Sequence, residues 1–304
     1  MVYMENDGLA VAVIGLGGIA RGAYLPVLGT RADLQLRLMT RDRARLDALG
    51  AAYHVPPECR FTELEALLAD PPQAAFVHVA TVAHAEVVTR LLDAGVPTYV
   101  DKPLADTLAA SRALIAHAER TGTPLMVGFN RRHAPAYVEA ARTPRETVIL
   151  QKNEADAPGA VRDVVFDDFI HVVDTLRFLA PGDVSDVTVS GRVEDGMLEH
   201  AALTLSGPGF TCFGAMNRRA GAKAERLQLI GDGHHRDIHD LVEAPTGWAP
   251  VGRVKGIEQI CEHFLAAVRG ETQYPDLQDA LATHELCEQV VERLAERPAE
   301  RLDG

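Results

Sequence analysis

The first part of the chain alternates apolar-rich runs with longer segments of helical spacing. The apolar-rich runs occupy residues 9–14, 34–39, 74–80, 96–100 and 125–127. Runs of this kind are typical of strands that are buried on both faces of a sheet. Helices are expected between them, for example over Glu86 to Ala94 and over Leu108 to Arg120. Because strand and helix alternate throughout, this part of the chain predicts a doubly wound parallel α/β sheet.

The pattern changes after about residue 130. A strand is expected at 147–152, and shorter alternating segments follow at 186–193, 197–205, 209–216 and 225–230. Two amphipathic helices, at 257–268 and 277–294, complete the pattern. Short strands at this spacing predict an α+β domain with a large, mostly antiparallel sheet, one face of which is open to a partner subunit. We therefore expect two domains, over residues 1–128 and 129–304.

One predicted helix, from Phe166 to Leu179, carries polar residues within an apolar pattern. Its apolar positions recur at mixed steps of three and four, which indicates a largely buried helix. Asp167, His171 and Asp174 fall at i, i+4 and i+7 and are expected on one face. Such groups on a buried helix are costly unless they are paired or functional. A solvated face, or a histidine satisfied by a nearby aspartate, would explain this helix equally well.

Composition narrows the class of protein. The 304 residues suffice for two domains with ordinary cores, and 47% hydrophobic with 24% charged residues is typical of a soluble globular protein. The net charge of −13 argues against nucleic acid or an anionic membrane as the main partner. No apolar run approaches membrane-spanning length, and the polar, acidic start does not resemble a signal peptide. We expect a cytoplasmic protein with reduced thiols, because no C-x-x-C pair occurs among Cys59, Cys212, Cys261 and Cys287.

The first apolar run ends in the motif G-x-G-x-x-A over residues 15–20. Gly15 would make the tight turn, and Gly17 would let the backbone approach a pyrophosphate. Ala20 is small enough for the following helix to pack on the strand, with its N-terminus facing the phosphates. A merely structural turn is the alternative, but the strand before the motif and the helix after it favour a dinucleotide site. The cofactor contacts predicted here are Gly15, Gly17, Gly18, Ile19 and Ala20.

The end of the second strand bears on the choice of cofactor. Thr40 and Arg41 stand where proteins that prefer NAD usually carry an acid for the ribose 2′-hydroxyl. Arginine suits a 2′-phosphate, so the sequence favours NADP, with Thr40 and Arg41 as contacts. Asp42 lies one place further on and could still contact a ribose, which leaves NAD possible. The neighbouring Arg43 and Arg45 are expected on a solvated helix face.

Further candidates follow the later strands, at the sheet edge where open α/β sheets bind ligands. Ala80, Thr81 and His84 follow one strand and are predicted to contact the cofactor. Asp101 and Lys102 end the next strand, and a lysine fixed there by a following proline is well placed to face a ligand. The last strand of this part leads into Gly-Phe-Asn-Arg-Arg at 128–132.

These four motifs together resemble those of the Gfo/Idh/MocA oxidoreductases. The motifs are the glycine loop at 13–20, Asp-Lys-Pro at 101–103, Gly-Phe-Asn-Arg-Arg at 128–132 and D-x-x-x-H-x-x-D at 167–174. Their order and spacing agree over the whole chain, and their wording is similar to that of the MviM-like subgroup. Asp101 in place of the commoner Glu, Val82 in place of Pro, and the short chain depart from the family's pattern.

The resemblance implies a Rossmann domain and assigns roles to matching positions. Lys102, Asp167 and His171 correspond to the catalytic residues, and these three with Asn130 and Arg131 would contact the substrate. His171 would exchange a proton with the substrate hydroxyl, and Lys102 would polarise the oxygen. Asp167 would orient the imidazole of His171 or share the proton. Asp174 would anchor the helix.

The implied function is an NADP-preferring oxidoreductase that acts on a hydroxyl or carbonyl of a sugar, a cyclitol or a related small polar metabolite. A homodimer or homotetramer formed through the C-terminal sheet is expected. Three alternatives remain open: a lyase or hydrolase with tightly held NAD, a non-catalytic dinucleotide-sensing regulator, and reduction of an imine. No metal site is expected. The histidines within 233–239 are expected in a hairpin and are interpreted as a solvated loop. The Cys–His pairs of the last two helices are interpreted as packing and surface, and Trp248 as core.

Overall fold

The computed structural model describes residues 8–241 and 251–296, so Trp248 lies outside the described residues. The chain forms two compact units. The first comprises Met1–Gly128 and Ile257–Leu281, and the second comprises Phe129–Gly256 and Ala282–Gly304. The predicted second domain, 129–304, is therefore interrupted. The reason is that helix α10 (Ile257–Val268) returns to pack in the hydrophobic core of the first unit.

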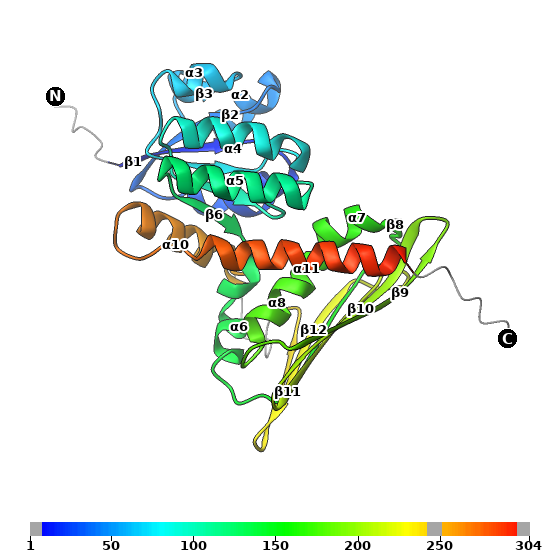
Figure 1. The fold of residues 1–304 in the computed structure, drawn as a ribbon. Helices are drawn as coiled ribbons and strands as arrows, with labels where there is room; N and C mark the ends of the chain where they lie inside the picture. The colour runs from blue at the N-terminus through cyan, green and yellow to red at the C-terminus, as the bar shows by residue number, and fades with distance from the viewer. Residues whose placement is uncertain (1–7, 242–250, 297–304) are drawn as a thin grey trace. The chain divides into compact units, whose positions relative to one another are not determined.

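The first unit is built on a six-stranded parallel sheet (Figure 1). Its strands are β1 (Leu9–Ile14), β2 (Leu34–Met39), β3 (Arg60–Phe61), β4 (Ala74–Val77), β5 (Thr98–Asp101) and β6 (Leu125–Gly128). Their order is β3-β2-β1-β4-β5-β6, and every pairing is parallel. The strand order reverses direction between β1 and β4, which is where such sheets open a crevice for ligands. The predicted doubly wound fold is confirmed.

Helices pack around this sheet and share its core. They are η1 (Ala20–Tyr24), α1 (Leu25–Leu28), α2 (Arg43–Ala52), η2 (Pro57–Cys59), α3 (Leu64–Leu68), η3 (Thr81–Ala83), α4 (His84–Asp93), α5 (Leu108–Thr121) and α10. The ring of Phe76 on β4 meets Phe264 of α10 edge-on, with centroids 5.0 Å apart. Local signals fix the helix ends: Thr107 caps α5 by accepting from the amide of Ala110, and Gly122 ends it in the left-handed region.

In the first unit, two strand boundaries differ by two residues or more from those expected. β4 ends at Val77 rather than at residue 80, and the chain then enters the short helix η3. β5 begins at Thr98 rather than at residue 96, because Pro97 has no amide hydrogen to donate to a neighbouring strand. These shifts leave His78 and Asp101 at adjacent strand ends.

The second unit is built on a seven-stranded sheet. Its strands are β7 (Thr147–Asn153), β8 (Gly159–Ala160), β9 (Asp186–Glu194), β10 (Met197–Gly207), β11 (Phe210–Asn217), β12 (Ala224–Gly231) and β13 (His234–His239). The order is β13-β12-β7-β11-β10-β8, with β9 also paired to β10. The pairing of β7 with β11 is parallel and the other pairings are antiparallel. The expected mostly antiparallel sheet is confirmed.

Helices of the second unit cover one face of this sheet. They are η4 (Asn130–His133), α6 (Pro135–Ala140), α7 (Val161–Val164), η5 (Val165–Phe169), α8 (Ile170–Leu179) and α9 (Val251–Val254), while α11 (Leu277–Ala295) begins in the first unit and ends in the second. A side chain at Gly214 on β11 would collide with Val172 and Leu176 of α8. Glycine there therefore lets α8 lie close on the sheet (Figure 1). Phe213, the residue before Gly214 on β11, points to the opposite face of the sheet and is 44% exposed.

Two predictions about local structure are wrong. The helix expected from Phe166 to Leu179 is not α-helical throughout, because η5 is a π-helical turn that precedes α8. The segment 233–239 is not a solvated loop but lies largely in the strand β13, which pairs with β12. The turn between these strands is Asp232-Gly233, both with positive φ, as tight hairpins require.

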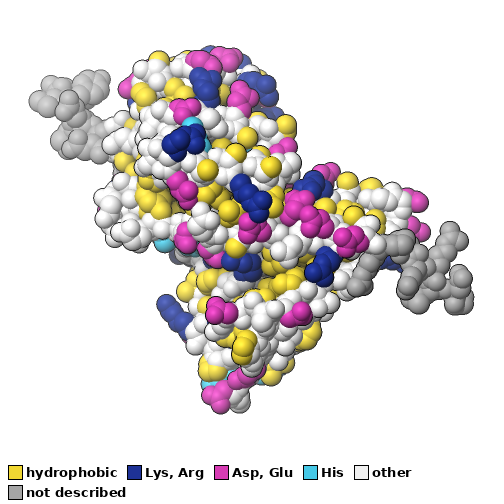
Figure 2. Space-filling view, viewed as in Figure 1, with side chains coloured by type: hydrophobic (Ala, Val, Ile, Leu, Met, Phe, Trp, Pro, Cys, Tyr) yellow, Lys and Arg dark blue, Asp and Glu magenta, His cyan; other side chains and the backbone are white. Residues whose placement is uncertain are grey.

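The remaining expectations concern cysteines, metals and membrane spans. All four cysteines are free thiols. Within 8–241 and 251–296, no group of three or more His, Cys, Asp or Glu side chains is placed to hold a metal ion. Among the same residues, no helix combines the length and the apolar character needed to cross a membrane. Side chains of both charge signs are interspersed over the face shown in Figure 2.

Candidate active site

The glycine loop of the first unit has the geometry that a dinucleotide requires. Gly15 has φ of +87°, and a Cβ there would lie 2.5 Å from the amide nitrogen of Val79. Only glycine therefore allows β1 and the loop after β4 to approach this closely. Around Gly17 and Gly18 the space is open, so the loop backbone is accessible. Ala20 is fully buried where the following helix begins. These features fit a bound pyrophosphate.

At the tip of β2, the side chain of Arg41 is open to a ligand, whereas that of Asp42 is engaged within the protein. The carboxylate of Asp42 accepts from the amide of Arg45 at 3.0 Å and so caps α2. The ribose contact that the sequence left open for Asp42 would compete with this cap. Arg43 pairs with Asp47 on the exposed side of the same helix, as expected of a solvated face. Arg41 is exposed at the tip itself.

The end of β5 holds a buried hydrogen-bond network around Asp101. One carboxylate oxygen accepts from Nδ1 of His78 at 2.7 Å, and the other accepts from the Tyr24 hydroxyl at 2.9 Å. The Tyr24 hydroxyl also lies 2.6 Å from that of Tyr99. Burial alone would raise the pKa of Asp101, but the charge and hydrogen bond of His78, with help from Tyr24 and Lys102, hold that pKa below its ordinary value of 3.8. The carboxylate next to Lys102 is therefore ionised at neutral pH.

His78 and Tyr24 were not predicted from the sequence. His78 interrupts an otherwise apolar run, and this was the signal available. Its partner is 23 positions away, so no local pattern identifies it.

His84 was predicted to contact the cofactor, and the structure gives it a different set of neighbours. The ring is 1% exposed, with Nδ1 at 2.9 Å from the carbonyl of Pro103 and Nε2 at 3.1 Å from that of Val79. Burial lowers the pKa of His84, so the ring is neutral at pH 7. It bridges the loops after β4 and β5, and its direct contact with a cofactor stays a prediction. Thr81 begins η3 beside it.

In the second unit, Asp167 and His171 are accessible on an otherwise buried segment. Asp167 lies in η5 and is exposed, and His171 lies in the first turn of α8 and is half-buried. The residues between and after them, such as Phe169 and Val172, are fully buried. A polar pair left accessible in this setting is suited to a ligand rather than to the core.

Asp174 does not share this accessible face, although the i+7 spacing placed it there. It is 1% exposed and accepts from the guanidinium of Arg132 at 2.7–3.0 Å and from Thr283 at 3.1 Å. The Arg132 guanidinium also lies over the rings of Phe129 and Phe178. Asp174 therefore anchors α8 to the segment that follows β6.

Asn130 and Arg131, which precede Arg132, were predicted to contact the substrate. Both side chains form hydrogen bonds within the second unit. Asn130 donates from Nδ2 to the carbonyl of Lys255 at 2.7 Å. Arg131 forms two hydrogen bonds with Glu225 on β12, at 2.9 and 2.6 Å, and Tyr137 donates to the same carboxylate. Burial would raise the pKa of Glu225, but Arg131 and Tyr137 hold it below its ordinary value. Substrate contact by these two residues stays a prediction.

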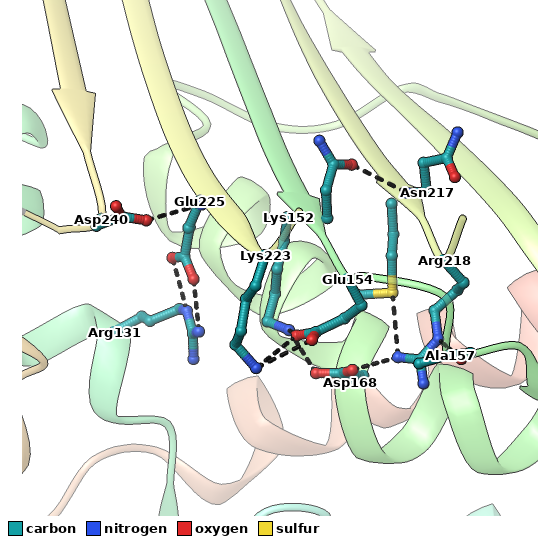
Figure 3. Close-up of polar contacts among 12 residues, drawn as sticks. Arg131, Lys152, Glu154, Ala157, Asp168, Asn217, Arg218, Lys223, Glu225 and Asp240 are labelled. Carbon is teal, nitrogen blue, oxygen red and sulfur yellow. Dashed lines mark hydrogen bonds and ion pairs between the residues drawn. The ribbon is translucent and has the colours of Figure 1, made fainter. Parts of the chain in front are cut away.

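A row of ion pairs beside η5 was missed by the sequence reasoning (Figure 3). Lys152 on β7 contacts Asp168 at 2.5 Å and Glu154 at 3.1 Å, and Arg218 contacts the other oxygen of Asp168. Lys223 extends the row at Glu154. Burial would raise the pKa of Asp168, but the two cations outweigh it and hold that pKa below 3.8. The single available signal was the position of Lys152, which falls on the same face of β7 as the buried residues Val148 and Leu150.

Comparison with known proteins defines the class to which this fold and these residues belong. The sequence model of the Gfo/Idh/MocA oxidoreductase family, with an NAD-binding Rossmann fold, matches residues 9–129. A YceM-like C-terminal domain matches residues 135–246. The chain belongs to the Gfo/Idh/MocA family and is an NAD(P)-dependent oxidoreductase.

Individual relatives agree with this class. YceM of Salmonella typhimurium, described as an oxidoreductase, is 33% identical over 87% of this chain and 91% of its own. The myo-inositol dehydrogenase Hyg17 of Streptomyces leeuwenhoekii is 32% identical over 60% of this chain and 59% of its own. The crystal structure of the dehydrogenase MviM from Clostridium difficile matches with a TM-score of 0.87 and 27% identity, over 94% of this chain and 99% of that one.

The ion-pair row predicts how stability depends on pH. Because the folded pKa of Asp168 lies below its unfolded value, the ion pairs stabilise fully above about pH 4 and this contribution is lost as pH falls through the folded pKa. Asp168→Asn should therefore lower the free energy of unfolding by roughly 2–4 kcal/mol at pH 7, since Lys152 and Arg218 lose their partner. The difference from wild type should shrink markedly at pH 3, as measured by urea unfolding.

The matched control is Asp163→Asn, which changes an exposed carboxylate one turn earlier. Its effect should stay small at both pH values. An Asp168→Asn deficit that is equal at pH 7 and pH 3 would show that the charge of this carboxylate does not stabilise the row.

Proposed function

We propose that this protein is an NADP(H)-preferring oxidoreductase for a hydroxyl or carbonyl of a sugar, a cyclitol or a related small polar metabolite. The observation that carries the proposal is that one chain holds two sets of polar groups suited to binding a ligand. The first unit has an open glycine loop and a lysine beside an ionised, buried aspartate. The second unit has Asp167 and His171 as an accessible pair on a buried helix.

The proposed roles follow from the chemistry of each side chain. The nicotinamide ring, when bound, supplies the site that accepts or returns a hydride. His171 takes the proton of the substrate hydroxyl during oxidation and returns it during reduction. Asp167, four residues earlier, orients the imidazole, and Lys102 polarises the substrate oxygen. Metal assistance has no part in this proposal.

The polar character of the second unit supports a polyhydroxylated substrate. The carboxylate of Asp168, next to Asp167 in sequence, is 26% exposed and is fixed by two cations. Lys152 and Arg218 are thereby held in place as hydrogen-bond donors. Fixed donors and acceptors of this kind suit a ligand with many hydroxyl groups. Hyg17, a relative named for myo-inositol, is consistent with a cyclitol or sugar.

The preference for NADP is supported by the tip of β2. No acid is free there in the way that NAD recognition uses one, since Asp42 caps α2 and pairs with Arg45 at 3.2 Å. Arg41 is exposed and carries the positive charge nearest the end of the strand. A guanidinium is well suited to a 2′-phosphate.

The cofactor preference can be tested without knowing the substrate. Arg41→Ala should weaken NADPH by about tenfold or more and leave NADH within about twofold, because one charge-assisted contact to phosphate is lost. The measurement is a fluorescence titration of purified protein, after any co-purified cofactor has been identified. Arg43→Ala is the matched control, since Arg43 already pairs with Asp47. An unchanged ratio of NADPH to NADH affinity in Arg41→Ala would contradict the assignment.

The catalytic role of His171 is tested on any sugar or cyclitol that wild type turns over. His171→Ala should lower kcat on the order of 10²–10⁴-fold, because a general acid–base is removed, while NADPH affinity changes little. His234→Ala, at an exposed histidine on β13, should retain wild-type turnover. Wild-type kcat in His171→Ala would refute the role. Tightly retained NAD without net turnover in wild type would instead favour transient oxidation by a lyase or hydrolase.

We also propose that the outward face of the seven-stranded sheet joins two copies of this chain. Phe213 on β11 and Ile230 on β12 are 44% and 43% exposed there, on strands that flank β7. The opposite face is covered by α8. Exposed large apolar side chains on neighbouring strands are typical of a subunit interface.

Changing the centre of this face should weaken assembly. Phe213→Asp should shift the protein toward monomer at micromolar concentration, because a charge would be buried between the copies. Light scattering after size-exclusion chromatography measures the mass. Val184→Asp alters an apolar residue of similar exposure in the loop before β9 and is the control. Equal masses for wild type and Phe213→Asp would place the interface elsewhere or show a monomer.

A further inference from the structure

We propose that Asp101 sets the preference of this protein for the oxidised over the reduced form of its dinucleotide. The inference rests on the proposed function, in which Lys102 serves the nicotinamide end of the cofactor. It goes further by giving a role to Asp101, the residue before the lysine. The carboxylate of Asp101 is bonded to His78 and Tyr24 within the first unit.

Asp101 is a fixed negative charge. Its two oxygens accept hydrogen bonds from separate elements, His78 after β4 and Tyr24 in η1. Since the Tyr24 hydroxyl donates to Asp101, the Tyr99 hydroxyl donates to Tyr24 in turn. This chain of donors stabilises the ionised carboxylate and prevents it from turning toward solvent.

The groups that surround this carboxylate on the other sides are neutral. Burial raises the pKa of the Tyr24 and Tyr99 hydroxyls and of the Cys261 thiol, so all three are protonated at neutral pH. Burial lowers the pKa of His84, so its ring carries no charge.

His78 contacts Asp101 from a position closed to solvent. Its ring packs against Tyr24, with centroids 4.1 Å apart and ring planes tilted by 38°, and its side chain has no exposed surface. Nε2 has no hydrogen-bond partner among the described residues. The bond from Nδ1 to Asp101 therefore fixes the orientation of the ring. Asp101 is thus a buried carboxylate fixed at both oxygens, with Lys102 next to it in sequence.

The two redox forms of the cofactor differ by one positive charge on the ring, and this difference is what Asp101 would sense. β5 ends at Asp101, at the sheet edge where parallel α/β folds bind ligands. A fixed anion at that edge favours the oxidised ring, and the adjacent ammonium of Lys102 disfavours it. Unit charges roughly 10 Å apart, at an effective dielectric constant near 20, change a binding constant by about tenfold.

The two charges therefore predict opposite effects. Asp101→Asn should raise the ratio Kd(NADP⁺)/Kd(NADPH) by about tenfold, since the anion is lost and the shape is kept. Lys102→Met should lower the same ratio by a similar factor. NADPH is titrated by its fluorescence, and NADP⁺ is measured by its displacement of NADPH. Asp101→Glu should restore a ratio near that of wild type, and Tyr24→Phe, which keeps the charge, should change it by less than about threefold.

The matched control is Asp93→Asn. Asp93 ends α4 and is largely exposed, and its substitution changes the net charge equally. If Asp93→Asn moves the ratio as far as Asp101→Asn does, net charge rather than this site is responsible and the inference is overturned. A ratio within about twofold of wild type in Asp101→Asn also overturns it. If that variant does not fold, Asp101→Ser, which also removes the charge, decides in its place: a raised ratio supports the inference and an unchanged ratio overturns it.

The failure of the inference is distinguishable from that of the proposed function. Wild-type protein that binds neither dinucleotide overturns both. Tight binding of NADPH with a ratio that ignores both charges overturns the role of Asp101 alone.

Discussion

The buried carboxylate of Asp101 is the interaction on which the arrangement of the first unit's strand ends depends. It receives hydrogen bonds from the residue after β4 and from the helix that follows the glycine loop, while belonging itself to β5. Three segments that are separate in sequence are therefore held at one point. A buried charge is costly unless its hydrogen bonds are complete, so this point tolerates little displacement. The backbone at Lys102, the next residue in the chain, is therefore held in place as well.

The second unit uses the same physical device twice. Arg132 and Asp174 tie α8 to the segment after β6, and Arg131 and Glu225 tie that segment to β12. Breaking either pair would leave a buried charge without a partner, which is costly. The accessible Asp167 and His171 therefore stand on a helix whose position is fixed from behind. Such support holds catalytic side chains in place without contacting the substrate.

Much of the fold could be predicted from the sequence, because it rests on local patterns. β1, β2 and α10 have the expected bounds, since apolar periodicity and glycine punctuation specify them directly. The glycine loop and the pair Asp167 and His171 also came from short motifs. Predictions failed where distant partners decide the outcome. No local pattern near His78 indicates that Asp101 is its partner, and none near Lys152 indicates that Asp168 is its partner. The return of α10 to the first unit depends on side chains such as Phe76, far away in sequence.

The π-helical turn η5 makes the segment that carries Asp167 and His171 sensitive to length as well as to composition. A π turn holds one more residue than the α-helical turn it replaces, so it behaves as an insertion accommodated without a loop. Removing one residue from 165–169 would let the segment become regular α-helix, with rotation of roughly 100° for everything before the deletion. Asp174 and its arginine would stay in place, and a deletion at 168 or 169 would rotate Asp167 relative to His171. Relatives that differ by one residue here would thus share the fold and the anchor yet present a different pair of groups to the substrate.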